Sequence, residues 1–182
     1  MRMSSIRTTR LLLRPFAAHD LDAFAALNAD PRVREFYPSV LTRAESDESA
    51  GVYMRHWERY GFGRWTIEVP GVTPFAGIVG PMHVPFSAPF TPAVEIGWRL
   101  AHAHWGQGYA TEAARAVVQF GFDTLGLVEI VAFTVPHNLR SRHVMERLGM
   151  TQSPEDDFDY PLLSEGHPLR RHVLYRLRRE ST

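Results

Sequence analysis

A short glycine-containing segment between a strand pattern and a helix pattern constrains the fold of this chain more than any other feature. Ala93–Leu100 alternates apolar with other side chains, which predicts a strand. Ala110–Leu125 then repeats apolar side chains at helical spacing, and Val128–Val135 is a nearly continuous apolar run, typical of a strand buried on both faces. A strand, a helix and a strand of these lengths predict a parallel pair joined by a right-handed crossover.

The rest of the chain predicts further strands and helices around this unit. Strands are expected at Arg10–Pro15, Trp65–Val69, Phe75–Val84 and His172–Arg178. Helices are expected from about His19 to Asn28, from a capping box at Thr42–Glu45 to Tyr60, and from an Asn138 cap to Leu148. Four prolines between Pro81 and Pro92 indicate a loop or a sheet edge. The 182 residues contain no repeat or linker, so one domain spanning 1–182 is expected.

Composition excludes several kinds of chemistry. The chain has no cysteine, and all 20 of its basic residues are arginine. This excludes thiol nucleophiles, disulfides, Schiff-base lysines and the lysine-dependent P-loop. The 20 acidic residues balance the basic ones, so bulk charge gives no sign of nucleic-acid or membrane binding. We find no signal peptide and no apolar run as long as a membrane span, and therefore expect a cytoplasmic protein.

The segment from Trp105 to Thr111 has the composition of a phosphate-binding loop. Gly106 and Gly108 allow a ligand close to the backbone, and the following helix would point unpaired N–H groups at it. A tight turn without a ligand explains the glycines equally well. A dinucleotide fingerprint would need glycine at Thr111 and an acidic end to the next strand, which ends on Thr134–Val135 instead. A nucleotide-binding redox protein is therefore disfavoured.

Four segments of the chain occur in an order that matches one family. Trp105–Ala113 resembles the acetyl-CoA pyrophosphate loop of the GNAT acetyltransferase superfamily, and Glu95–Trp98 resembles the strand that pairs with the pantetheine arm. Asn138–Ser141, followed by Met145–Met150, resembles the last helix of that family. Arg10–Pro15 resembles the opening strand of the subgroup that contains ribosomal-protein N-terminal (alanine/serine) acetyltransferases.

The resemblance implies a fold class and a reaction. The fold would be α/β (α+β), with a mixed, mostly antiparallel sheet flanked by helices and two splayed parallel central strands, Ala93–Leu100 and Val128–Val135. The reaction would move acetyl from acetyl-CoA to a primary amine, either a protein N-terminal α-amine or a small-molecule amine, by direct attack without a metal. A non-catalytic acyl-CoA-binding module is the alternative. Acetyl-CoA and an amine acceptor are the expected partners of a monomer or homodimer, with no membrane and no nucleic acid.

The resemblance also assigns roles to residues. Ser141 would protonate the departing CoA thiolate, although a serine in a first helical turn often only supports the cap. Glu95 is a candidate from its place on the central strand and not from the resemblance. A buried carboxylate there would accept the amine proton directly or through water, although an ion pair with an arginine is the slightly favoured explanation. A backbone N–H on the first central strand would hold the thioester oxygen. The expected cofactor-binding residues are Ile96, Trp98, Leu100, Trp105, Gly106, Gln107, Gly108, Tyr109, Ala110, Thr111, Asn138 and Ser141.

One charged segment allows two interpretations. The run Glu155–Asp159 precedes the last predicted strand, where the resemblance places one border of the acceptor site. An acidic rim would attract a cationic amine. A solvated acidic loop is the favoured explanation.

Overall fold

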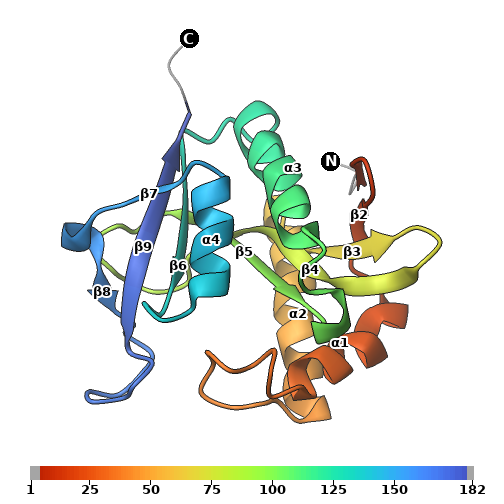
Figure 1. Cartoon of the computed structure of the whole chain (residues 1–182), viewed down its shortest axis with the longest axis horizontal. Helices are drawn as coiled ribbons and strands as arrows, with labels where there is room; N and C mark the ends of the chain where they lie inside the picture. Colours follow the sequence, from red (N-terminus) through yellow and green to blue (C-terminus); the bar gives the residue numbers. More distant parts are fainter. Residues whose placement is uncertain (1–4, 180–182) are drawn as a thin grey trace.

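A sheet of nine strands, formed by residues 5–179, the part that this computed structural model describes, crosses the molecule (Figure 1). The strands are β1 (Ile6–Arg7), β2 (Leu12–Pro15), β3 (Trp65–Val69), β4 (Thr73–His83), β5 (Val94–Leu100), β6 (Glu129–Thr134), β7 (Thr151–Gln152), β8 (Phe158–Asp159) and β9 (Arg171–Arg178). Their order is β1-β2-β3-β4-β5-β6-β9-β7, with β8 paired to β9. Only the β5–β6 pair is parallel among the described strands, which confirms the mixed, mostly antiparallel sheet.

The parallel strands β5 and β6 separate soon after they meet. β5 pairs with β4 along its whole length, from Val94 opposite His83 to Leu100 opposite Gly77. Its register with β6 is a single position, Glu95 opposite Val131. The later part of β5 thus has a strand neighbour on one side only, within the described chain. This is the splayed pair that the family resemblance implied.

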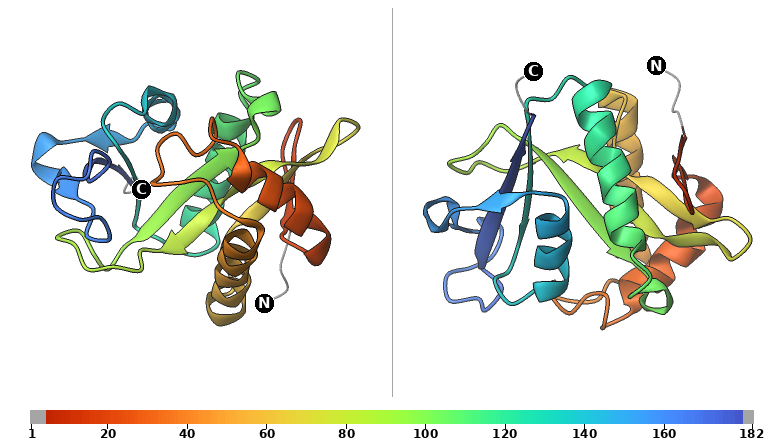
Figure 2. Two further views of the ribbon diagram at one scale, coloured as in Figure 1. Left: turned by 90° about the horizontal axis from the view of Figure 1, so that it is seen from below. Right: turned by 45° about the horizontal axis from the view of Figure 1, so that its top comes forward.

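Helices cover both faces of the sheet. They are α1 (Leu21–Ala29), α2 (Arg43–Tyr60), α3 (Tyr109–Asp123) and α4 (Leu139–Arg147), with single 3₁₀ turns at Ala18–Asp20, His102–His104 and Pro154–Asp156. Seen from below, α3 and α4 lie on one side of the central strands, and α2 lies on the other (Figure 2, left). None of the helices within 5–179 is both long and apolar enough to cross a bilayer.

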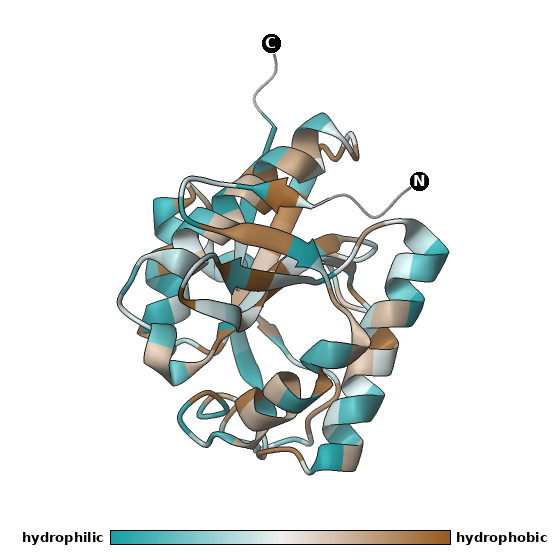
Figure 3. Ribbon diagram, turned by 90° about the vertical axis from the view of Figure 1, so that its right-hand side faces the viewer, coloured by the Kyte–Doolittle hydropathy of each residue, from teal (hydrophilic) through white to brown (hydrophobic). Residues whose placement is uncertain are grey.

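Local sequence signals explain where these helices begin and end. Glu45 N–H and the Thr42 side chain make the predicted capping box at the start of α2, and Gly61 ends that helix with φ 74°. α3 buries its predicted apolar stripe, including Ala113, Val117 and Gly121. In Figure 3 the strands in the middle of the view are largely brown, whereas the helices alternate between teal and paler colours. Each helix therefore packs one apolar face against the sheet.

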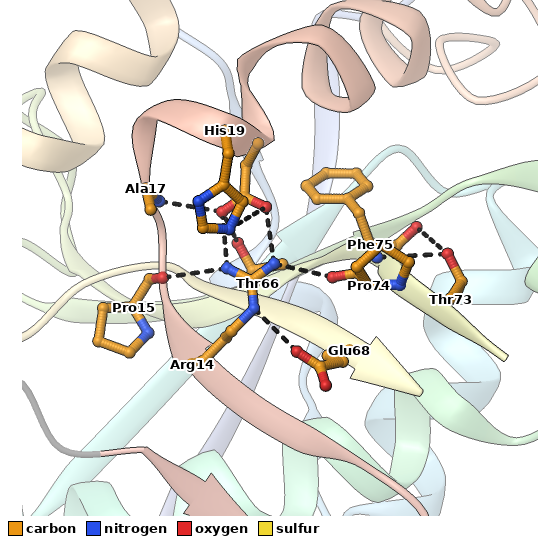
Figure 4. A network of polar contacts seen from close by, with 10 residues as sticks. Arg14, Pro15, Ala17, His19, Thr66, Glu68, Thr73, Pro74 and Phe75 are labelled. Atoms are coloured by element: carbon orange, nitrogen blue, oxygen red, sulfur yellow. Dashed lines mark hydrogen bonds and ion pairs between the residues drawn. The ribbon is translucent and has the colours of Figure 1, made fainter. Parts of the chain in front are cut away.

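A buried polar network ties the N-terminal strands to the start of α1 (Figure 4). Both oxygens of Asp20 accept hydrogen bonds from the guanidinium of Arg14 at 2.8 Å, and Thr66 Oγ1 donates to Asp20 at 3.0 Å. Arg14 Nε also donates to Glu68 at 3.0 Å. Burial alone would raise the pKa of Asp20, but these hydrogen bonds hold it below its usual range. An ionised, fully partnered carboxylate therefore joins β2, β3 and α1.

The structure corrects some details of the sequence prediction. Three two-residue strands, β1, β7 and β8, were not predicted, because two residues carry no periodic signal. α3 begins and ends slightly earlier than predicted, at Tyr109 and Asp123. Pro81 lies inside β4, opposite Ile96, as the predicted strand Phe75–Val84 implied, and β4 ends at His83. The β3 pairing ends at Val79, so Pro81 is at an edge position, where no ladder donor is required on the open side.

The buried imidazole of His56 is expected to make stability depend on pH. His56 Nε2 accepts from the backbone N–H of His83 at 3.1 Å, and Nδ1 lies 2.7 Å from Phe62 O, so the neutral ring satisfies both contacts. Burial, and then the charges of His83 and Arg64, lower the pKa of His56. Below the unfolded value of about 6.5, the unfolded chain binds a proton that the folded chain does not, so stability falls as pH falls.

The measurement is the melting temperature between pH 8 and pH 5 for the wild type and for His56→Gln. We expect a smaller acid loss in the variant than in the wild type, because its side chain cannot titrate. The exposed His143, replaced by glutamine, serves as the control and should keep the wild-type slope. Equal slopes in the wild type and in His56→Gln would contradict the assignment.

Candidate active site

A cavity of about 330 Å³ opens where β5 and β6 diverge. Four parts of the chain line it: the end of β5, the loop into α3, the start and outer face of α4, and the segment between α1 and α2. The predicted site residues in its wall are Trp98, Leu100, Trp105, Gly106, Gly108, Tyr109, Ala110, Thr111, Asn138 and Ser141. Glu95, Ile96 and Gln107 are not part of that wall.

The loop into α3 takes the form that its glycines require. Gly106 and Gly108 have φ of 74° and 78°, a left-handed backbone that is costly for other residues. Trp105 Nε1 donates to Leu100 O at 2.8 Å, which holds the loop against the end of β5. Glu112 N–H donates to Gly108 O at 3.1 Å, so α3 starts immediately after the second glycine. The loop therefore lies at the positive end of a helix, as predicted.

A carboxylate from α3 anchors the loop to the N-terminal segment. Glu112 Oε1 accepts from Thr8 Oγ1 at 2.6 Å and from Arg10 N–H at 2.8 Å. Arg10 also donates to Glu112 Oε2 at 2.7 Å and to Gln107 O at 2.9 Å. Burial alone would raise the pKa of Glu112, but these donors hold it below its usual range. The anchor spans about a hundred residues of sequence, so no local pattern could reveal it.

The start of α4 orients the Ser141 hydroxyl. Ser141 N–H donates to Asn138 Oδ1 at 3.3 Å, which confirms Asn138 as the N-cap. With Oδ1 so assigned, Nδ2 of Asn138 donates to Thr134 Oγ1 at 2.9 Å and to Ser141 Oγ at 3.2 Å. Ser141 Oγ is thus an acceptor toward Asn138, and its own proton is free to point elsewhere. Because Ser141 lines the cavity, that proton can be donated to a ligand there.

The cavity wall is basic. Its basic residues are Arg99, His104, Arg140, His143 and Arg147, and no aspartate or glutamate lines it. Arg140 lies over the ring of Trp105, with Cζ 4.6 Å from its centroid, and pairs with Glu35. Sequence reasoning did not place Arg99, Arg140, His143 or Arg147 in the site. The spacing of Arg140, His143 and Arg147 along one face of α4 was a signal that would have found three of them.

Glu95 is held by Arg64, the residue just before β3. Arg64 Nη2 lies 2.6 Å from Glu95 Oε1, and Arg64 Nη1 donates to Gly97 O at 3.0 Å and to Gly80 O. A Cβ on Gly97 would come within 2.7 Å of Arg64, so glycine leaves room for this ion pair. The favoured explanation for Glu95, an ion pair, agrees with these contacts. Its role as a base stays a prediction.

Ile96 and Gln107 lie outside the cavity wall, in two different environments. The Ile96 side chain is buried at 2% exposure in the core, so only its backbone can contact a ligand in the gap beside β5. Gln107 is exposed on the outer side of the glycine loop. Among residues 5–179, no group of three or more His, Cys, Asp or Glu side chains lies close enough to hold a metal.

Two of the four acidic residues of the run Glu155–Asp159 are ion-paired. Asp156 lies 2.8 Å from Arg176, and Asp159 lies 3.5 Å from Arg171. The Arg176 hydrogen bond lowers the pKa of Asp156. Arginines of β9 therefore partly neutralise the negative charge of the run. This weakens its interpretation as a rim that attracts cationic amines.

Comparisons with known proteins agree with this geometry. The family model described as an acetyltransferase (GNAT) domain matches residues 10–151. The chain is 33% identical over 147 residues to the uncharacterized protein YkkB of Bacillus subtilis, covering 80% of this chain and 84% of that protein. The crystal structure of an acetyltransferase from Agrobacterium tumefaciens superimposes with a TM-score of 0.79 at 30% identity, covering 98% of this chain and 96% of that one.

A more distant structure bears on the subgroup. RimL, a ribosomal L7/L12 alpha-N-protein acetyltransferase solved in complex with coenzyme A, superimposes with a TM-score of 0.76 at 18% identity, covering 96% of this chain and 98% of that one. At that identity the likeness is one of fold alone, so the ribosomal-protein subgroup stays a prediction. The family match covers most of the chain, and on that ground this protein belongs to the GNAT acetyltransferase family.

Proposed function

We propose that the chain is an N-acetyltransferase that moves acetyl from acetyl-CoA to a primary amine by direct attack. The observation that carries the proposal is the Ser141 hydroxyl, oriented by Asn138 toward a basic cavity that the glycine loop borders. We also propose a single catalytic domain over residues 1–182 and a cytoplasmic location. The proposal includes a monomer or homodimer, and the subgroup of ribosomal-protein N-terminal acetyltransferases. Residues 1–4 and 180–182 of that domain lie outside the described residues.

The donor would lie along the gap between β5 and β6. Its phosphates carry negative charge, which favours the α3 N-terminus and the basic side chains of α4 in the cavity wall. The pantetheine arm would lie beside β5, where backbone groups after Glu95 have no β6 partner. A backbone N–H at Ile96, Gly97 or Trp98 would hold the thioester oxygen, a contact of about 3 kcal/mol in the transition state.

The reaction needs one proton acceptor and one proton donor. The nitrogen of a neutral amine attacks the thioester carbon, the carbon–sulfur bond breaks, and the thiolate leaves. The proton lost from the amine goes to water or to Glu95. Ser141 supplies a proton to the sulfur and is then reprotonated from solvent. A free thiol has a pKa of about 8.5, so the thiolate is a fair leaving group and the help it needs is moderate.

Two assays test the proposal against a non-catalytic acyl-CoA-binding module. Acetyl-CoA should raise the melting temperature by binding the folded state, and NADH should not. Release of CoA with a panel of amines should then exceed release without an amine. Stabilisation without amine-dependent release would favour the binding module, and stabilisation by NADH alone would overturn the family-based site.

Replacing Gly108 by valine is expected to raise the KM for acetyl-CoA by at least about tenfold. The left-handed backbone at Gly108 is incompatible with a β-branched residue, so the loop must change its path. A Cβ would meet only Arg10, at 3.4 Å, so the fold should survive. The control is Gly126→Val, which has a similar φ of 67° and lies outside the loop. Equal KM values for both variants would contradict the role of the loop.

The base role of Glu95 has a pH signature. A base assists most when the amine is protonated, so Glu95→Gln should lower kcat strongly at pH 6 and little near pH 9, for an α-amine with a pKa of about 7.7–8.0. Glutamine can still accept from Arg64, which limits the structural change. A uniform loss of kcat across pH would mean that Glu95 acts only by positioning Arg64.

A further inference from the structure

Two arginines lie against one tyrosine at the end of the cavity formed by β5 and the α1–α2 segment. Tyr37 and Arg99 both line the cavity. Cζ of Arg99 lies 5.0 Å from the centroid of the Tyr37 ring, and Cζ of Arg34 lies 4.1 Å from the same centroid. Two positive charges thus lie against the same ring: Arg99 in the cavity wall, and Arg34, which is not part of that wall.

Neither arginine has a carboxylate partner within residues 5–179. Arg99 donates to Asn28 Oδ1 and, at 3.2 Å, to the hydroxyl of Tyr53, and both groups are neutral. Arg99 Nε is buried and makes no hydrogen bond to a described residue. Arg34 Nε donates to the carbonyl of Ser39 at 2.8 Å. Both side chains are half-buried. Holding positive charge partly out of water without a counter-ion is unfavourable, and an anion supplied by a ligand would offset that cost.

Two other arginines near the site have carboxylate partners. Arg64 is paired with Glu95, and Arg140 is paired with Glu35. The uncompensated charge affects its neighbours: burial and then Arg99 lower the pKa of Arg34. Burial alone would raise the pKa of Tyr53, but Arg99 and Arg64 hold it below its usual value. Arg34, in the α1–α2 segment, and Arg99, on β5, thus carry positive charge without an ion-pair partner among residues 5–179, away from the α4 arginines proposed to face the phosphates.

We propose that Arg34, Tyr37 and Arg99 form a subsite for a carboxylate carried by the amine acceptor, so that the enzyme prefers amino-acid-like amines. The inference rests on the proposed N-acetyltransferase function and adds the acceptor class. A planar guanidinium matches a carboxylate with two parallel hydrogen bonds, and the Tyr37 ring, 39% exposed, borders the same space. Arg34 and Arg99 act here by binding and positioning the acceptor.

The test compares acceptors in matched pairs, each an amino acid and its carboxamide. CoA release should give kcat/KM at least about tenfold higher for the acid, the size expected of a charge-assisted hydrogen bond. Arg34→Gln and Arg99→Gln should each remove most of this preference through the acceptor KM and leave the KM for acetyl-CoA unchanged. Arg32→Gln is the matched control, since Arg32 is on the same segment and pairs with Asp30 at 2.7 Å.

A second measurement does not depend on turnover. Binding of N-acetylated amino acids and of their carboxamides, in the presence of CoA, is followed by calorimetry, and the acids should bind at least about tenfold more tightly. Melting temperatures identify any variant that fails to fold, and Arg34→Gln is informative if Arg99→Gln does fail. Equal use and binding of acid and amide, or an effect on acetyl-CoA alone, would overturn the subsite. If no amine causes CoA release but the acids still bind more tightly than the carboxamides, the proposed function is overturned and the subsite remains supported.

Discussion

Replacing Ser141 by alanine is expected to lower kcat by about 100-fold and to leave the KM for acetyl-CoA unchanged. General acids contribute about 10²–10⁴-fold, and a thiolate leaving group places this donor at the lower end. The hydroxyl accepts from Asn138 at 3.2 Å, so its proton is available to the cavity. The cap of α4 should survive, because Asn138 Oδ1 bonds the backbone of residue 141 and not the hydroxyl.

The expected measurement is kcat and KM under saturating acceptor, with the melting temperature as a check on folding. Ser164→Ala, at an exposed loop position, is the control for a serine-to-alanine change and should keep wild-type kcat. Full kcat in Ser141→Ala would mean that Ser141 only supports the helix start. The thiolate would then take its proton from water or from another residue.

Replacing Gly80 by alanine is expected to destabilise the fold by at least about 3 kcal/mol, because overpacking between fixed backbones cannot relax. A Cβ at Gly80 would lie 2.1 Å from Gly63 O and 2.8 Å from Arg64 Cα, both backbone atoms next to β3. Any shift would also displace Arg64, which donates to Gly80 O and holds Glu95. Activity should therefore fall along with stability.

Urea unfolding measures this effect against a matched glycine. Gly166 has a left-handed φ of 80° and no atom within 4 Å of an added Cβ, so Gly166→Ala should cost only the backbone strain of about 1–2 kcal/mol. A free energy of unfolding for Gly80→Ala within 1 kcal/mol of that of the control would contradict the steric argument. It would mean that β4 can move away from β3 at this point.

Much of the fold was predictable because its signals are local. The alternation in β5, the apolar stripe of α3 and the continuous run of β6 each depend on side chains a few residues apart. The capping box at Thr42 and the cap at Asn138 are local for the same reason, since an orphan N–H is satisfied within one turn. The two-residue strands β7 and β8 form only because β9 offers free backbone groups, and β9 lies far along the chain.

The candidate site also has a part that local signals predict and a part that they do not. The glycine loop and the start of α4 were predictable, because the helix N-terminus and the left-handed glycines are properties of adjacent residues. The Arg34–Tyr37–Arg99 cluster was not, since Arg99 reaches Tyr37 only when β5 packs against the α1–α2 segment. The same holds for Glu95, whose partner among 20 arginines was decided by the lack of a side chain at Gly97.

The sequence by itself determined which helices and longer strands form, where the glycine loop lies, and that neither thiol nor lysine chemistry is available. These properties follow from residue type and short-range spacing, which are present in the unfolded chain. Only the tertiary structure decided which charges meet: Glu112 with Arg10, Glu95 with Arg64, and Arg99 with no acid among the described residues. The physical reason is that ion pairing depends on distances of a few ångström between side chains that only packing brings together.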